Sequence, residues 1–226
     1  MPIAFGVLAV AARFDVGAFF RRHLSVERTT FDYGTLRGLP ESYGWEAAQN
    51  ALAGRVVSQS AGGAALATLA GGCFWGTELH FMRMPGVIAT CVGYTQGALE
   101  HPTYSEVCTG TTGHTEACQV VYDPSVCSFE SLCEKLFETI DPTVRNRVGN
   151  DQGTQYRHGI YPHTEEQMAI ARDFIARKQE HYSNPIVTEV KAASIFWPAE
   201  EYHQQYLKKG GQSARKGDRT KVRCYG

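Results

Sequence analysis

A cysteine inside a glycine-aromatic segment, residues 71–76 (GGCFWG), has the features of a reactive thiol. Residues 77–84 after it have the composition of a helix, which would place Cys73 in the first helical turn. A thiol there faces unpaired backbone N–H groups and the positive end of the helix dipole, and both favour the thiolate. The two aromatic residues supply an apolar wall beside the sulfur. The segment predicts a nucleophilic thiol; the alternative is a buried cysteine packed under a helix.

The other thiols favour neither a metal site nor a disulfide framework. The chain has seven cysteines, an odd number, scattered without a C-x-x-C pair: Cys73, Cys91, Cys108, Cys118, Cys127, Cys133 and Cys224. A structural zinc site needs clustered ligands, so we expect no metal. Glu200, Glu201 and His203 have spacings seen in metal sites, but we interpret them as one polar helix face. We expect reduced thiols in a reducing compartment.

The composition is that of an ordinary globular protein. Of 226 residues, 43% are hydrophobic and 20% charged, and the formal net charge is −1. That balance gives no reason to expect a nucleic-acid or membrane partner, and the longest apolar run is too short to span a bilayer. We expect a monomer.

The two ends differ from the middle of the chain. Residues 1–64 form an N-terminal extension in which the apolar run Phe5 to Ala12 precedes several arginines. A secretory signal has the opposite order, so the sequence favours a plastid or mitochondrial transit peptide, with a disordered extension or a cytoplasmic protein as the alternative. Residues 210–226 are predicted to be a flexible, basic tail carrying Cys224.

Between these ends, residues 65–209 read as a catalytic domain of alternating strands and helices. Strands are expected at 65–70, 87–94, 115–122 and 186–193, and helices at 77–84, 128–140, 164–182 and 199–208. The long irregular stretch 141–163 is of a length that is usually functional or disordered. This order predicts an α+β fold: a ferredoxin-like split βαβ two-layer sandwich with added helices and long loops.

Seven short motifs now identify a resemblance. They come in one family's order and spacing: 72–76 (GCFWG), 93–95 (GYT), 102–104 (PTY), 113–116 (GHTE), 122–124 (YDP), 150–157 (NDQGTQYR) and 202–206 (YHQQY). Over about residues 66–226 the chain resembles methionine sulfoxide reductase A. The resemblance implies reduction of methionine S-sulfoxide, free or in oxidised proteins, through a cysteine sulfenic acid. It also implies no bound cofactor, and thioredoxin (dithiothreitol in vitro) as the reductant.

The resemblance assigns a role to each site residue. Cys73 would attack the sulfoxide sulfur. Glu116, whose aromatic surroundings keep its carboxyl protonated near neutral pH, would protonate the oxygen. Tyr104 and Tyr156 would donate hydrogen bonds to that oxygen, and Asp151 would orient Cys73 or a water. Phe74 and Trp75 would form the methyl pocket.

The second thiol is where the sequence departs from the family pattern. Relatives with the Arg-Cys-Tyr-Gly ending usually carry another cysteine a few residues earlier, but residues 216–219 here read KGDR. Cys224 is therefore the predicted resolving thiol, and Cys108 is the runner-up. Two other functions stay open from the residues alone. A different thiol enzyme would need a base beside Cys73, and His80 lies two turns away along the helix; a non-catalytic α+β binding module is the other.

Overall fold

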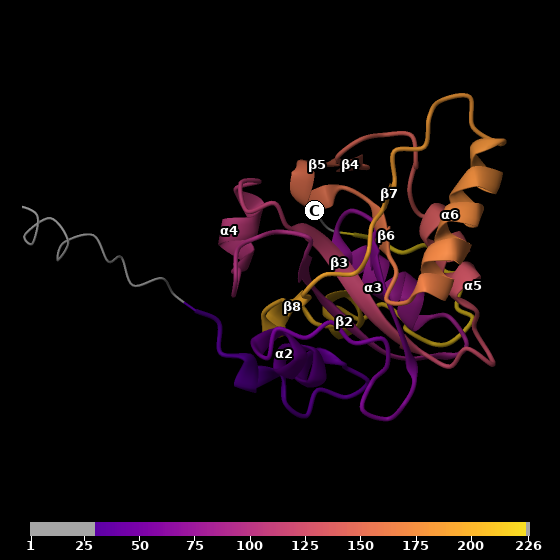
Figure 1. The fold of residues 1–226 in the computed structure, drawn as a ribbon. Coiled ribbons are helices and arrows are strands. Elements are labelled where there is room, and N and C mark those ends of the chain that lie inside the picture. The colour runs from indigo at the N-terminus through magenta and orange to yellow at the C-terminus, as the bar shows by residue number, and fades with distance from the viewer. Residues whose placement is uncertain (1–29, 225–226) are drawn as a thin grey trace, which may run out of the picture. The chain divides into compact units, whose positions relative to one another are not determined.

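The computed structural model describes residues 30–224, and from Phe31 onward they form one compact unit. Its centre is a six-stranded sheet in the order β7-β6-β1-β3-β2-β8 (Figure 1). The three central strands are antiparallel: β1 (Ala65–Ala70), β3 (Thr115–Tyr122) and β2 (Val87–Thr95). The outer strands are short: β6 (Gly159–Tyr161), β7 (Glu189–Val190) and β8 (Trp197–Pro198).

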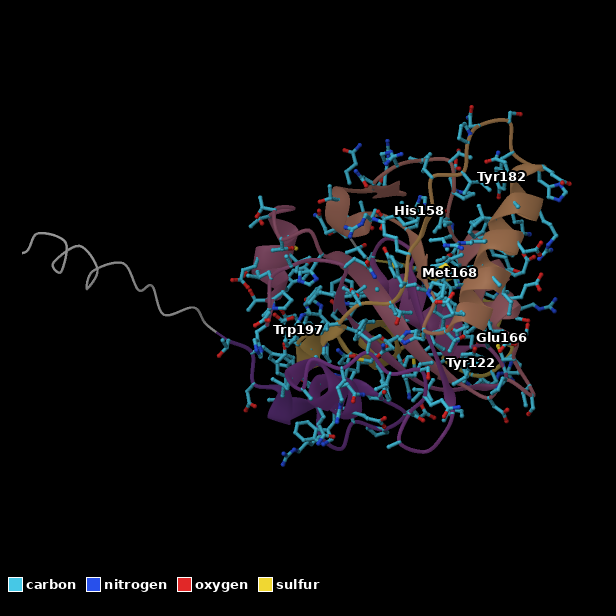
Figure 2. The ribbon with its side chains drawn as sticks, in the orientation of Figure 1. Tyr122, His158, Glu166, Met168, Tyr182 and Trp197 are labelled. Atoms are coloured by element: carbon cyan, nitrogen blue, oxygen red, sulfur yellow. The ribbon has the colours of Figure 1, made fainter. Side chains whose placement is uncertain are left out.

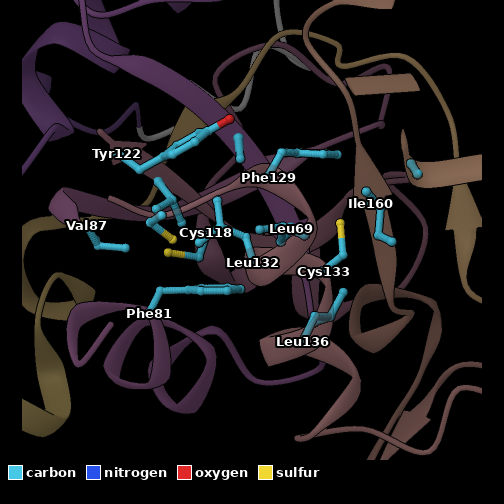
Figure 3. Close-up of a cluster of buried hydrophobic side chains, with 14 of the residues drawn as sticks. Leu69, Phe81, Val87, Cys118, Tyr122, Phe129, Leu132, Cys133, Leu136 and Ile160 are labelled. Carbon is cyan, nitrogen blue, oxygen red and sulfur yellow. The ribbon is translucent and has the colours of Figure 1, made fainter. Parts of the chain in front are cut away.

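Both faces of the central strands are buried, which explains why β1 is apolar along most of its length. Ala67 and Leu69 point to a core shared with helices α3 (Phe74–Met82), α5 (Phe129–Phe137) and α6 (Glu165–Gln179) (Figure 3). Leu66 and Ala70, at alternating positions, point to a second core on the other face. Four of the cysteines (Cys91, Cys118, Cys127 and Cys133) belong to these cores and need no role beyond packing.

The predicted α+β class is confirmed, and the long regular elements lie where the sequence places them. The expected helix 199–208 is instead split into η3 (Glu201–His203) and α7 (Tyr206–Lys209). Between them Gln205 has a left-handed φ of 54°, which a continuous helix cannot contain. The strand expected at 186–193 is shorter in the structure, where it consists of β7 alone.

The irregular stretch 141–163 is ordered by short elements and buried side chains. It contains β4 (Arg147–Val148), β5 (Asp151–Gln152), η2 (Thr154–Tyr156) and β6. His158, labelled in Figure 2, is buried and bonds Thr188 Oγ1 at 2.9 Å and the carbonyl of Val144 at 2.7 Å. The loop that carries Asp151 and Tyr156 is therefore tied to the domain at its base.

The boundary expected at residue 64 needs correction. Residues 31–64 contain η1 (Tyr33–Leu36) and α2 (Gly44–Leu52), and both pack on the domain. Leu36 and Ala48 are buried against Trp197 of β8 (Figure 2). Apolar residues of this segment cover the end of the sheet, so it belongs to the compact unit. Of the segment 1–64 predicted as a transit peptide, residues 1–29 lie outside the described residues.

Residues 30–224 contain neither a membrane-spanning helix nor a cluster of metal ligands. No helix in this range is long and apolar enough to cross a membrane. The same residues contain no group of three or more His, Cys, Asp or Glu side chains placed to hold a metal ion.

Candidate active site

The first turn of α3 presents Cys73 at the helix N-cap. Gly72 before it has a φ of +79°, and a Cβ there would lie 2.5 Å from the Cβ of Val148, so only glycine fits. Thr77 Oγ1 lies 3.2 Å from the carbonyl oxygen of Cys73 and 3.3 Å from that of Gly71. Strand β1 thus leads through a tight glycine turn into a helix that begins at the thiol.

Glu116 lies beside this turn and is buried, with 1% of its surface exposed. It projects from β3, where it pairs with Tyr94 of β2, and its Oε2 accepts the backbone N–H of Phe74 at 3.0 Å. The pKa of Glu116 is raised to about 8. Burial is the main cause, the Phe74 N–H acts against it, and the nearby carboxyl of Asp151 adds to the rise. This carboxyl is therefore protonated at neutral pH.

Tyr104 and Tyr156, the two predicted hydrogen-bond donors, both interact electrostatically with Glu116. Burial raises the pKa of Tyr104 and that of Tyr156, and the charge of Glu116 raises both further. The pKa of Tyr156 also responds to Asp151 and Cys73. Both phenols consequently stay protonated and able to donate at any pH near neutrality.

Aromatic rings line the side of the site next to Phe74 and Trp75. Trp75 stacks on Tyr206 with 3.9 Å between ring centroids, and its Nε1–H donates to His203 Nδ1 at 3.1 Å. Phe74 packs 5.1 Å from the His203 ring and 5.9 Å from Tyr94. The result is an apolar wall of fixed orientation beside the sulfur.

Glu200 and His203 do not lie on a polar helix face, so the interpretation made from the sequence is wrong. His203 is buried, and burial lowers its pKa to about 4. Glu200 accepts the Tyr94 hydroxyl at 2.9 Å and the backbone N–H of Tyr104 at 2.8 Å. Both residues hold the aromatic wall and Tyr104 in place. Sequence reasoning missed them because their spacing matched an exposed helix; the YHQQY motif was the only available signal.

Cys224 meets Cys73 at the N-terminus of α3. Its sulfur lies where a side chain at Gly76 would be, 2.7 Å from the position of a Cβ, and it interacts with the Gly76 N–H and the Cys73 thiol. The shared hydrogen bond lowers the pKa of Cys224 and raises that of Cys73, and burial raises the latter further. The first proton of the pair is thus lost more easily than that of an isolated thiol, and the second less easily.

The sequence predicted a lowered pKa at Cys73 itself, and this needs correction. The helix N-terminus acts on the pair, and the lowered pKa belongs to Cys224.

A cavity of about 220 Å³ opens beside the two thiols and contains Asp151 in its wall. Asp151 is partly exposed there, and burial raises its pKa. His80 also lines this cavity, and burial lowers its pKa to about 4, so it is neutral. His114 accepts the Gly97 N–H at 3.2 Å and bonds the Leu99 carbonyl at 2.7 Å, so it shapes its own turn.

Cys108, the runner-up thiol, lies at the end of α4 (Tyr104–Cys108) and is exposed. Its hydrogen bond is with the side chain of Tyr104, and burial raises its pKa. The structure brings together Cys73, Glu116, Asp151, Cys224 and the two phenols, and it places Cys108 on the phenol side rather than against Cys73.

Residues 65–223 match the family model described as peptide methionine sulfoxide reductase. The chain belongs to this family. The predicted family, its oxidoreductase class and its reductase function are confirmed.

Curated members of the peptide methionine sulfoxide reductase family include close relatives. Peptide methionine sulfoxide reductase A2-1 of Oryza sativa subsp. japonica is 53% identical over 164 residues, which cover 73% of this chain and 88% of the relative. The chloroplastic A4 protein of Arabidopsis thaliana is 52% identical over 73% of this chain, which spans 66% of that protein's length.

Solved members of the family share the fold. Mxr1 of Saccharomyces cerevisiae in its reduced form superposes with a TM-score of 0.64 at 34% identity, covering 70% of this chain and 92% of the yeast chain. Methionine sulfoxide reductase A of Corynebacterium diphtheriae gives a TM-score of 0.62 at 39% identity, covering 70% of this chain and 81% of the bacterial chain.

Proposed function

We propose that this chain reduces the S epimer of methionine sulfoxide, in oxidised proteins and as the free amino acid, with Cys73 as the nucleophile. The observation that carries the proposal is the protonated Glu116 carboxyl bonded to the Phe74 amide, one residue from Cys73. A sulfoxide oxygen leaves only when protonated, so a thiol beside an un-ionised acid suits this reaction.

In the first half of the reaction the thiolate of Cys73 attacks the sulfoxide sulfur. Glu116 gives its proton to the sulfoxide oxygen, which ends as the hydroxyl of a Cys73 sulfenic acid, and methionine leaves. The proton that Cys73 lost goes to solvent, and Glu116 takes a proton back from solvent after turnover. Tyr104 and Tyr156 donate to the oxygen as negative charge develops on it, and Asp151 orients Cys73 or a water.

The S-methyl group of the substrate binds against Phe74 and Trp75. The Trp75 ring is held by His203 on its polar edge and by Tyr206 on its face, so the pocket is formed before substrate arrives. A preorganised apolar wall on one side of the sulfur and donors on the other distinguish the two epimers of a sulfoxide, because only one presents methyl and oxygen to the correct sides.

In the second half Cys224 attacks the sulfenic sulfur of Cys73. A Cys73–Cys224 disulfide forms, and the hydroxyl leaves as water with the Cys224 proton. Thioredoxin, a dithiol protein, then reduces this disulfide by exchange and is itself oxidised. The contact between the two sulfurs in the reduced protein supports direct resolution without a second tail cysteine.

The test is epimer-resolved reduction of methionine sulfoxide with dithiothreitol and with thioredoxin. We expect S-epimer activity with both reductants in the parent, none in Cys73→Ser, and loss of the thioredoxin-driven activity in Cys224→Ser. Hydrogen peroxide and a thioester, offered as alternative substrates, distinguish another thiol enzyme. Activity on these instead of the sulfoxide would overturn the proposal, as would full thioredoxin turnover in Cys224→Ser.

We also propose an organellar destination and a monomer. The arginines that follow the apolar run near the start of the chain, and relatives named chloroplastic in Arabidopsis thaliana and rice, support a plastid address. All proposed site residues come from one chain, which supports a monomer. Fusion of residues 1–30, which precede the compact unit, to a fluorescent protein tests the organellar destination, and light scattering of the reduced protein tests the monomer.

A further inference from the structure

The tail that carries Cys224 is closed into a loop by one side chain. The Gln212 amide pairs with both backbone groups of Arg223: Nε2 donates to the carbonyl at 2.6 Å, and Oε1 accepts the N–H at 3.0 Å. The backbone N–H of Gln212 in turn bonds the carbonyl of Leu207 in α7 at 2.9 Å. We call residues 212–223 the tail loop; its last residue adjoins Cys224.

Arg83 ties the middle of the tail loop to the domain. Its guanidinium donates from Nε to the carbonyl of Ser213 at 2.8 Å, and from Nη1 to that of Thr220 at 2.6 Å. Its own carbonyl accepts the N–H of Gly217 at 2.7 Å. Arg83 is buried, so these bonds are shielded from water and its rigid fork of donors has a defined geometry.

Lys216 and Asp218 complete the anchoring. Lys216 Nζ donates to the carbonyls of Met82 and Val87, both at 2.7 Å. Asp218 accepts the backbone N–H of Thr220 at 2.8 Å and its hydroxyl at 2.7 Å, which folds the loop back on itself. The sequence predicted a free, flexible tail. That prediction is wrong for the described part of the tail, which is bound to the domain at several points.

Helix α3 links the anchor to the nucleophile. Arg83 is its C-cap and Cys73 its N-cap. Nine helical residues span about 14 Å, and the tail loop bridges that length from Arg83 back to the helix N-terminus. At that end Gly76 leaves the space that the Cys224 sulfur occupies.

We propose that Gln212 and Arg83 are positioning residues that hold Cys224 against Cys73 for the second half of the reaction. This inference rests on the proposed function, in which Cys224 resolves the Cys73 sulfenic acid. Neither residue touches the reacting atoms in the first half, since Arg83 lies at the far end of α3 and, among residues 30–224, Gln212 bonds the tail and α7.

The expected slowing of disulfide formation follows from the conformational entropy of an unanchored tail. A flexible segment holds its thiol at an effective concentration of about millimolar, whereas a fixed pair of groups reacts at an effective concentration many powers of ten higher. Partial release of the loop in a single variant should therefore slow disulfide formation about 10-fold or more.

The experiment uses the full reduced chain with Gln212→Ala, Gln212→Glu and Arg83→Lys, each mixed with one equivalent of methionine S-sulfoxide. Gln212→Glu keeps a side-chain oxygen that accepts a hydrogen bond and loses the N–H donor. Arg83→Lys keeps the positive charge and loses the planar guanidinium with its several N–H donors. Arg177→Lys, at an exposed ion pair with Glu130, is the matched control. Methionine release and Cys73–Cys224 disulfide formation are followed separately, by quenching, alkylation and mass analysis.

We expect methionine release within about 2-fold of the parent in every variant, with disulfide formation slowed about 10-fold in Gln212→Ala and Arg83→Lys and less in Gln212→Glu. The sulfenic acid should accumulate in those variants. Disulfide formation at the parental rate in both would overturn the inference, and so would equal slowing of both steps, which marks a general structural role. If Arg83→Lys does not fold, the two variants of the partly exposed Gln212 test the inference on their own. Failure of the proposed function looks different: the parent then forms no Cys73–Cys224 disulfide.

Discussion

The Glu116 carboxyl lies 3.0 Å from the backbone nitrogen of Phe74, and this bond joins the acid to the helix turn that carries Cys73. Strand β3 supplies the acid and α3 supplies the thiol, and the Phe74 amide fixes their separation. The same amide stabilises the ionised carboxylate, yet burial dominates and raises the pKa of Glu116 to about 8. The site therefore holds a proton where a sulfoxide oxygen needs one.

Glu116→Gln removes the proton donor and preserves the shape of the residue. We expect single-turnover methionine release to fall about 10²- to 10⁴-fold, the range typical of a positioned acid. In the parent, release should decline as pH rises through about 8, because Glu116 ionises there and no longer donates. This alkaline decline should be missing in Glu116→Gln. A variant with parental rates would contradict the assigned acid.

Removing either phenol hydroxyl should slow the first step only. Tyr104→Phe and Tyr156→Phe keep the ring and lose one donor to the sulfoxide oxygen, which typically costs about 10- to 10³-fold. Tyr182→Phe, just beyond the C-terminal end of α6, is the control and should behave like the parent (Figure 2). The measurement is single-turnover release at pH 7. If both variants match Tyr182→Phe, the phenols are packing residues.

Gly76→Ala tests the approach of the second thiol. The added methyl would lie 2.7 Å from the Cys224 sulfur, so the sulfur must move away from Cys73 and the Gly76 N–H. We expect slower disulfide formation, with the thermal midpoint unchanged or higher because alanine favours the helix. Thiol titration after one equivalent of substrate, followed over time, measures the rate. An unchanged rate would show that the sulfur reaches Cys73 from another direction.

A buried acid outside the chemistry should make stability depend on pH. Glu78 is fully buried in α3, where it accepts the Thr90 hydroxyl at 2.9 Å and the Gln205 N–H at 2.7 Å. Burial raises its pKa to about 7 from 4.5. As pH rises from 4.5 to 7, the unfolded chain ionises this group while the native state keeps it protonated, so stability falls. The fall levels off above pH 7 and amounts to about 3 kcal/mol at most.

Glu78→Gln should lack this component. The free energy of unfolding of the variant relative to the parent, measured in urea at pH 5 and pH 7.5, should shift in favour of the variant at the higher pH. Glu116 contributes equally to both proteins and cancels in this difference. A difference that is the same at both pH values would show that Glu78 is not protonated in the native state.

Local pattern and motif order predicted the centre of this molecule. The glycine turn before Cys73 and the apolar runs of β1, β2 and β3 have short-range causes, namely backbone sterics and burial on both faces of the sheet. Cys73 and Glu116 lie together because Cys73 follows the end of β1, while Glu116 lies at the start of its antiparallel neighbour β3.

The features that the sequence did not reveal depend on long-range partners. His203 is a polar residue whose burial depends on distant aromatic partners, among them the Trp75 indole 128 positions away. The anchoring of the tail depends on Arg83, whose partners lie 130 and 137 positions further on. A glycine-punctuated basic segment has the composition of a free arm, and no local pattern shows that one buried guanidinium will bind it.

The most direct test of the account is one turnover without reductant. Reduced protein mixed with one equivalent of methionine S-sulfoxide should release one equivalent of methionine, while two of the seven thiols are lost as a Cys73–Cys224 disulfide identified by peptide mapping. The R epimer should release none. Absence of methionine, or a disulfide that omits Cys73, would contradict the account.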